Sequence, residues 1–326
     1  MLSREWEALA LTGRGVRIGV IDAGFAGWRD DPMLRGLQVE AEVDFTGEVH
    51  GDDLSQSTVD HGTRVLRALA GRDGGRIEGL APDARFLLVL ADAPQTETRA
   101  DEARTIAALR WLAARDVDVI NLSLGYIGFE DAQAYRVEDL DGHTARISAA
   151  LGELLVAYPD LVVVVSAGNR GARDWHYVGF PADVAEALTV GAVDPASGLR
   201  WRTSSVGPPW LPGIKPDVAT WGTRGTSFTA PAVAGLVACL REAAPQLSRR
   251  ELLAELRASG SRAMRPDRET GYGIPQTGVL AHWLAASAPA GQAGERAAVR
   301  PVARALPAWR PDAQATAAPA AARPSE

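Results

Sequence analysis

The chain has 326 residues, of which 46% are hydrophobic and 23% charged, proportions typical of a globular protein in water. Its formal net charge of −7 gives no sign of a nucleic-acid partner, because binding to phosphates calls for clustered basic residues. No run of 18 or more apolar residues occurs, so we expect no membrane partner and no membrane-spanning segment. Cys239 is the only cysteine, which excludes an intramolecular disulfide, and its apolar neighbours predict a buried structural thiol.

Short apolar segments rich in β-branched residues alternate with helical patterns along most of the chain. In order, we predict a strand at 16–22, a helix at 62–69, a strand at 85–90, a helix at 101–114, a strand at 117–123, a helix at 147–157, strands at 161–166 and 187–193, and helices at 229–243 and 248–259. This alternation predicts an α/β fold of three layers, αβα, with a mostly parallel central sheet covered by helices on both faces.

The composition changes beyond about residue 285. Ala, Pro, Arg and Gly dominate 286–326. Such a segment cannot bury enough apolar surface to offset the entropy lost on ordering. We therefore expect a single domain over 1–285 and a disordered Ala/Pro-rich tail over 286–326. The first residues lack a basic stretch followed by an apolar core, so the sequence predicts a cytoplasmic protein, or a secreted one if a leader has been trimmed.

Two candidate catalytic residues lie at strand-to-helix junctions in the first quarter of the chain. Asp22 ends the first predicted strand, at the sheet edge where α/β proteins bind ligands, although an Asp there also simply starts turns. His61 begins the first predicted helix, and histidine accepts protons near neutral pH, although a capping or surface histidine fits equally well. Each residue taken alone is a weak signal.

Two further segments add a candidate nucleophile and a candidate oxyanion donor. Ser227 stands between Gly225 and Pro231, which we place in the first turn of a long apolar helix, where positive potential favours a developing anion. A plain N-cap serine is the alternative reading. Asn169, between two glycines after the most strand-like segment, could donate its amide N–H to an oxyanion, or be an ordinary turn residue.

The order of these residues decides between the readings, because Asp, His and Ser follow the subtilisin order of the catalytic triad. Six segments resemble landmarks of the subtilisin-like (subtilase) serine proteases, over roughly residues 13 to 280. They are Val-Ile-Asp-Ala-Gly (20–24), His-Gly-Thr-Arg-Val (61–65), Gly-Leu-Ala-Pro-Asp-Ala (79–84), Val-Ile-Asn-Leu-Ser-Leu-Gly (119–125), Ala-Gly-Asn (167–169) and Gly-Thr-Ser (225–227). The resemblance implies the subtilisin-like fold and a serine endopeptidase acting on peptides or proteins.

The resemblance also implies a role for each matching residue. Ser227 attacks the scissile carbonyl, His61 carries the proton and Asp22 orients the imidazole. The Asn169 side chain and the Ser227 backbone N–H stabilise the oxyanion. The substrate pairs as an added strand with Ser123, Leu124 and Gly125, and Ala167 and Gly168 contribute to substrate binding. The pocket for the residue before the scissile bond is expected to involve 125–128, including Tyr126 and Ile127.

Several positions depart from the family pattern. Ala23 stands where the family usually has Ser or Thr, so a hydroxyl beside Asp22 is lost. Asp60 replaces the usual Gly before His61, and would raise the pKa of the imidazole if its side chain points inward. Phe228 follows the nucleophile where Met is common. Only six residues separate Val218 from Gly225, which predicts a cleft that is more open on that side.

Alternatives of a different kind remain at this point. A catalytically silent relative that only binds peptides would normally have lost a triad residue, and none is lost here. A specialised leader-peptide peptidase or a macrocyclising enzyme would use the same acyl-enzyme, and the sequence does not separate it from a general hydrolase. The chemistry requires no cofactor and no catalytic metal. No loop has clear carboxylate spacing for Ca²⁺, so structural calcium is left open.

Overall fold

The computed structural model describes residues 2–49, 53–74, 76–77, 79–92 and 97–287. The boundary that we predicted at residue 286 falls at the end of the last helix, α7 (Thr277–Ser287). The rest of the predicted tail, from residue 288 onward, lies outside the described residues.

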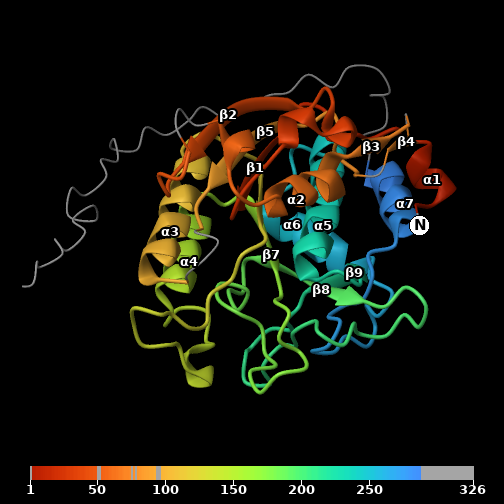
Figure 1. Cartoon of the computed structure of the whole chain (residues 1–326). Coiled ribbons are helices and arrows are strands. Elements are labelled where there is room, and N and C mark those ends of the chain that lie inside the picture. The colour runs from red at the N-terminus through yellow and green to blue at the C-terminus, as the bar shows by residue number, and fades with distance from the viewer. Residues whose placement is uncertain (1, 50–52, 75, 78, 93–96, 288–326) are drawn as a thin grey trace, which may run out of the picture. The chain divides into compact units, whose positions relative to one another are not determined.

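One parallel sheet of seven strands forms the centre of the described domain (Figure 1). Its strand order is β2-β5-β1-β6-β7-β8-β9, and every neighbouring pair runs parallel. The strands are β1 (Arg17–Asp22), β2 (Gln38–Asp44), β5 (Arg85–Leu90), β6 (Val119–Leu122), β7 (Val162–Ser166), β8 (Leu188–Val193) and β9 (Val218–Trp221). The central strands are continuous apolar runs because helices cover both of their faces.

Helices pack on both faces of this sheet (Figure 1). They are α1 (Arg4–Glu7), α2 (His61–Ala70), α3 (Arg99–Ala113), α4 (Arg146–Ala157), α5 (Thr226–Ala243), α6 (Arg249–Ala258) and α7. The core residues of α3 and α4 join one apolar cluster, and those of α2, α5 and α6 join the other. Successive β1 side chains point to opposite faces of the sheet. Val20 belongs to the cluster with α2, α5 and α6, and Ile21 belongs to the cluster with α3 and α4. The predicted three-layer αβα fold is therefore confirmed.

All ten predicted elements are present, and their ends move by three residues at most. Among the described residues, the elements that were not predicted are β2, β9, α1, α7, the two-residue strands β3 (Arg72–Asp73) and β4 (Arg76–Ile77), and several 3-10 helices of three residues each. Strand β2 lies at one edge of the sheet and has no fully buried residue, so it lacks the apolar run that marks the inner strands. Helix α1 has only four residues, too few for a helical period to be recognised.

Two of the candidate residues lie at the carboxyl ends of the neighbouring central strands β1 and β6. From β1 the chain moves outward to β2 and back to β5, and from there it crosses to β6 on the other side of β1. Loops leaving β1 and β6 therefore diverge, and ligands of open α/β sheets bind at such a point of strand-order reversal. Asp22 is the last residue of β1, and Ser123 directly follows β6.

A carboxylate on α5 fastens the N-terminal segment to this helix. One oxygen of the Glu242 carboxylate accepts hydrogen bonds from the backbone N–H groups of Thr12, Gly13 and Arg14, at 2.8, 2.8 and 3.1 Å. We expect Glu242→Ala to lower the free energy of unfolding by about 1–3 kcal/mol, because three donors lose a charged acceptor. Urea denaturation measures this, with Glu153→Ala on an exposed position of α4 as the control. Equal midpoints for the two variants would contradict the prediction.

Candidate active site

The Asp22 carboxylate and the His61 imidazole form a close pair above the carboxyl edge of the sheet. His61 Nδ1 lies 2.6 Å from Asp22 Oδ1, which also accepts the Ala23 backbone N–H at 2.8 Å. Asp22 is fully buried, whereas the His61 side chain is 30% exposed. The other carboxylate oxygen, Asp22 Oδ2, has no hydrogen-bond partner within the described ranges. This agrees with the hydroxyl that Ala23 lacks.

The pKa of His61 is set by opposing effects. Burial lowers this pKa most strongly, but the hydrogen bond to Asp22 and the charge of Asp22 together outweigh burial. Arg64 lowers the pKa further, and Asp60 raises it slightly, in the direction predicted from the sequence. The pKa of His61 therefore lies above the ordinary 6.5.

This shift predicts the acid side of the pH–rate profile. His61 can accept a proton only when it is neutral, so activity must rise as the pH passes upward through its pKa. We expect the acid limb of kcat/KM to have its midpoint above pH 6.5, with Asp60→Asn moving the midpoint down. Initial rates between pH 5 and 9 measure it, and a midpoint at or below 6.5 would contradict the prediction.

Helix α5 carries Ser227 at its second residue, with Gly225 as the N-cap. The helix begins at Thr226, three residues earlier than predicted, so the placement of Pro231 in its first turn was wrong. Pro231 is the sixth helical residue, and its missing N–H leaves the Ser227 carbonyl without the usual helical donor. The Ser123 hydroxyl takes that place and donates to the Ser227 carbonyl oxygen at 3.0 Å. Asn121 in turn donates to the Ser123 hydroxyl at 2.9 Å.

The residue after Ser227 brings α5 against the histidine. The Phe228 ring centroid lies 5.4 Å from that of His61. The hydrogen bond of Ser227 Oγ runs to the Ser123 carbonyl oxygen at 3.4 Å, and none joins it to His61 within the described ranges. Catalytic hydrogen bonds are often long before substrate binds. Ser227 therefore directly precedes the residue whose ring faces His61, and the two side chains share no hydrogen bond within the described ranges.

Asn169 is tied to the first turn of α5 through its carbonyl oxygen. Its Oδ1 accepts the Thr226 backbone N–H at 2.9 Å, and the buried Thr226 hydroxyl accepts the Gly168 N–H at 3.0 Å. These bonds leave the Asn169 amide N–H₂ without a protein acceptor among the described residues. Gly225 has φ +114°, and a Cβ there would meet both terminal atoms of the Asn169 side chain at 3.2 Å. Glycine is thus needed for this approach.

Thr226 was not singled out from the sequence, although it lies inside the Gly-Thr-Ser segment. Its hydroxyl links the turn at Gly168 to the start of α5, and it is fully buried. The only sequence signal was a hydroxyl residue directly before the candidate nucleophile.

The segment expected to pair with substrate follows β6. Ser123 is 5% exposed and uses its side chain on Ser227, while Leu124 is half-buried and Gly125 exposed. Within the described ranges, the backbone groups of Leu124 and Gly125 take part in no hydrogen bond. They are therefore available to an added strand. Ala167 is fully buried, with its N–H on Val190, so only its backbone neighbour Gly168 is accessible.

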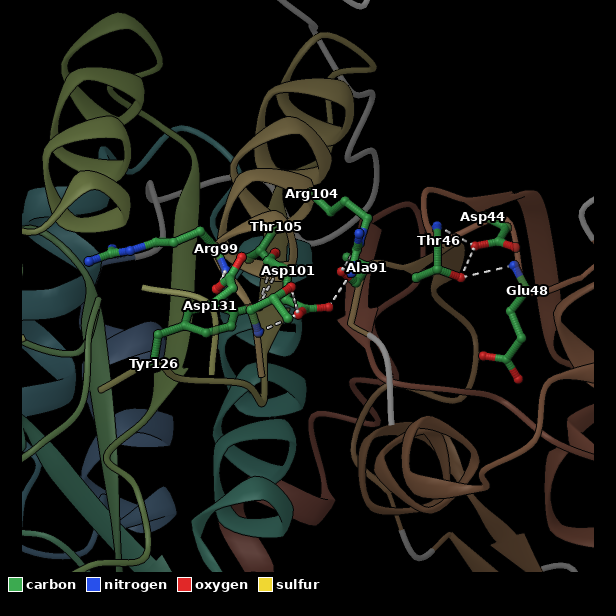
Figure 2. A network of polar contacts seen from close by, with 11 residues as sticks. Asp44, Thr46, Glu48, Ala91, Arg99, Asp101, Arg104, Thr105, Tyr126 and Asp131 are labelled. Carbon is green, nitrogen blue, oxygen red and sulfur yellow. Dashed lines mark hydrogen bonds and ion pairs between the residues drawn. The ribbon is translucent and has the colours of Figure 1, made fainter. Parts of the chain in front are cut away.

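Tyr126 was expected near the substrate pocket, and the structure places its side chain in the core instead. The ring is 1% exposed, and the hydroxyl lies 2.7 Å from the Thr105 hydroxyl and 3.2 Å from the Asp101 carbonyl oxygen (Figure 2). Its backbone forms an antiparallel bridge with Phe180. Tyr126 therefore fixes the path of the preceding segment and does not line a pocket. Ile127, by contrast, is half-buried.

The short connection before the nucleophile follows the edge strand β9. Trp221 ends this strand and is 45% exposed, and Arg224 is exposed three residues before Ser227.

No group of three or more potential ligands that could hold a metal ion occurs in the part of the chain that the structure describes. Likewise, none of its described helices is both long and apolar enough to cross a membrane.

Comparison with known proteins gives one consistent result. The family model described as the subtilase family, Peptidase_S8, matches residues 13–273. Subtilisin DY of Bacillus licheniformis is 28% identical over 253 residues, which cover 74% of this chain and 82% of that protein. A probable subtilase-type serine protease of Deinococcus radiodurans is 27% identical over 86% of this chain, which spans only 42% of that longer protein.

Solved structures with the same fold include MycP1 of Mycobacterium smegmatis, at 24% identity and a TM-score of 0.65, covering 92% of this chain and 87% of that one. The prenylagaramide maturation protease PagA has a TM-score of 0.64 at 19% identity, covering 86% of this chain and 99% of that one. At these identities the likeness concerns the fold alone.

Proposed function

Since the chain belongs to the subtilase family of serine proteases, we propose that it is an endopeptidase whose acyl-enzyme forms on Ser227 of an Asp22–His61–Ser227 triad. The observation that carries the proposal is the 2.6 Å contact between His61 Nδ1 and the fully buried Asp22 carboxylate, next to the first turn of α5. An imidazole held at Nδ1 has its Nε2 free to accept a proton.

The proposed reaction follows from the positions of these groups. His61 Nε2 takes the proton of Ser227 Oγ as the oxygen attacks the scissile carbonyl, and Asp22 stabilises the imidazolium that forms. The oxyanion receives N–H donors from the Asn169 side chain and from the Ser227 backbone, whose N–H belongs to the unpaired first turn of α5. His61 then protonates the leaving amine, and water releases the acyl group.

Substrate binding as an added strand supports cleavage within a peptide. The accessible backbone of Leu124 and Gly125 would pair with residues on the acyl side of the scissile bond. Gly168 would face the same part of the substrate from the neighbouring loop. We therefore propose peptide or protein substrates, bound mainly through their backbones.

Labelling with a fluorophosphonate probe tests the nucleophile. The wild-type chain should be labelled, Ser227→Ala should not, and Ser197→Ala, in an exposed turn, should be labelled like the wild type. Labelling that persists in Ser227→Ala would contradict the assignment of Ser227 as the nucleophile. A folded wild-type chain without labelling would favour a silent, peptide-binding relative. Mass spectrometry of the products with an added amine peptide separates hydrolysis from ligation or macrocyclisation.

We further propose that the chemistry uses no cofactor, because the triad itself supplies the nucleophile and the proton carrier. Dialysis against EGTA should leave kcat unchanged at 25 °C. Activity that is lost on dialysis and restored by Ca²⁺ would reveal a structural calcium site. The cytoplasmic location stays a prediction, and cell fractionation would test it.

A further inference from the structure

Helix α2 carries two arginines beyond His61, and they differ in how their charge is satisfied. Arg67 forms an ion pair with the buried Asp31 carboxylate. The half-buried Arg64 side chain has no ion pair and donates no hydrogen bond within the described ranges. Its guanidinium lies over the Phe228 ring, with Cζ 4.6 Å from the ring centroid. A cation–π contact holds the charge in place and uses none of its N–H donors as a hydrogen bond.

The position of Arg64 relative to the reacting groups follows from Phe228. That ring is 5.4 Å from the His61 ring, and the Arg64 charge is close enough to lower the pKa of His61. In the proposed reaction His61 delivers a proton to the leaving amine, so the leaving group must lie beside His61. Phe228 and Arg64 therefore border the leaving-group side, whereas Leu124 and Gly125 border the acyl side.

The charges around this position favour an anion. Asp22 is buried and committed to His61. The Asp60 carboxylate, at the start of α2, is exposed to solvent, and water and salt screen it. Arg64 is left as the partly desolvated charge next to the leaving group. A guanidinium presents a planar fork of N–H donors that matches a carboxylate.

We propose that Arg64 is a specificity residue that selects substrates with a carboxylate on the leaving-group side of the scissile bond. This inference rests on the proposed function, because that function defines the two sides. The carboxylate comes from an Asp or Glu side chain within the first two residues after the cut, or from the C-terminus of a short leaving peptide.

Cleavage of a proteome-derived peptide library, followed by a matched pair made from the best substrate, tests the proposal. The pair carries Asp or Asn at the first position after the cut. We expect kcat/KM for the Asp peptide to be about tenfold higher, the size of a charge-assisted hydrogen bond. Arg64→Gln should remove the preference, and Arg64→Glu should replace it by a preference for Lys or Arg at that position.

The control variant is Arg250→Glu, which makes the same change in net charge on an exposed position of α6 and should keep the Asp preference. A third peptide, with a C-terminal amide in place of the acid after a two-residue leaving group, separates the side-chain carboxylate from the terminal one. An Asp-to-Asn ratio that is the same in wild type, Arg64→Gln and Arg64→Glu would overturn the proposal.

A binding measurement keeps this result independent of catalysis. Ser227→Ala, immobilised, is mixed with the same library, and the retained peptides are identified by mass spectrometry. Enrichment of acidic peptides that disappears in the double variant with Arg64→Glu supports the role of Arg64, even if the wild-type enzyme cleaves nothing. Retention that does not depend on peptide charge in either variant contradicts it.

Discussion

Asp22→Asn should lower kcat by about 10⁴-fold while leaving KM nearly unchanged. Asp22 Oδ1 accepts from His61 Nδ1 at 2.6 Å, which keeps the lone pair on Nε2, where the Ser227 proton must go. An amide can instead donate to Nδ1, and the imidazole proton then moves to Nε2 and blocks the transfer. The replacement also removes the charge that raises the pKa of His61, so any residual activity should have its acid limb at lower pH.

Steady-state kinetics between pH 5 and 9 check this prediction, and Ala23→Ser is the companion variant. A serine there offers a hydroxyl beside Asp22 Oδ2, the carboxylate oxygen that has no partner within the described ranges. It should retain or raise kcat, because a satisfied carboxylate holds the imidazole more firmly. A loss of less than tenfold in Asp22→Asn would exclude the proposed role of Asp22.

Asn169→Ala should lower kcat by about 10²–10³-fold, because one of two oxyanion donors is lost. The expected effect on KM is small, since the donor acts on charge that develops only in the transition state. However, Asn169 Oδ1 also accepts the Thr226 N–H at 2.9 Å, so truncation removes a structural contact of α5 as well. The two effects must be separated.

Asn169→Asp separates them. An aspartate keeps an acceptor for Thr226, so its free energy of unfolding should stay close to the wild-type value. It supplies no donor and places a negative charge beside the oxyanion, so its kcat should fall at least as far as that of the alanine variant. Steady-state kinetics and urea denaturation of both variants measure kcat, KM and the free energy of unfolding. A defect that appears mainly in KM would show that Asn169 only positions substrate.

Local patterns along the chain were enough to predict the layers of the fold. Inner strands such as β7 are continuous valine-rich runs because both of their faces are covered by helices. The start of helix α6 is predictable because Ser248 and Glu251 form a capping box there. The edge strand β2 and the short α1 lack such signals. Their formation depends on pairing with β5 and on packing against α7, contacts that no local window contains.

The identities of the candidate residues Asp22, His61, Asn169 and Ser227 were predictable from the sequence, because each lies near a strand or helix end and their order is distinctive. Their mutual distances were not, since residues up to 205 positions apart meet only when parallel strands bring their carboxyl ends to one edge. The start of α5 was also not predictable, because Pro231 suggested that the helix begins later than Thr226. The earlier start is possible because the Ser123 hydroxyl donates to the Ser227 carbonyl oxygen, which Pro231 cannot do.

Periodicity and short motifs along the chain were enough to predict the fold class, the family and the residue types of the candidate site. Which polar groups around the candidate site have hydrogen-bond or ion-pair partners depends instead on contacts between residues far apart in the chain. Tyr126 is buried by contacts with α3, Thr226 binds the turn at Gly168, and Arg64 is left with an aromatic ring instead of a carboxylate. Hydrogen bonding and burial are properties of pairs of distant residues, and a one-dimensional pattern does not contain those pairs.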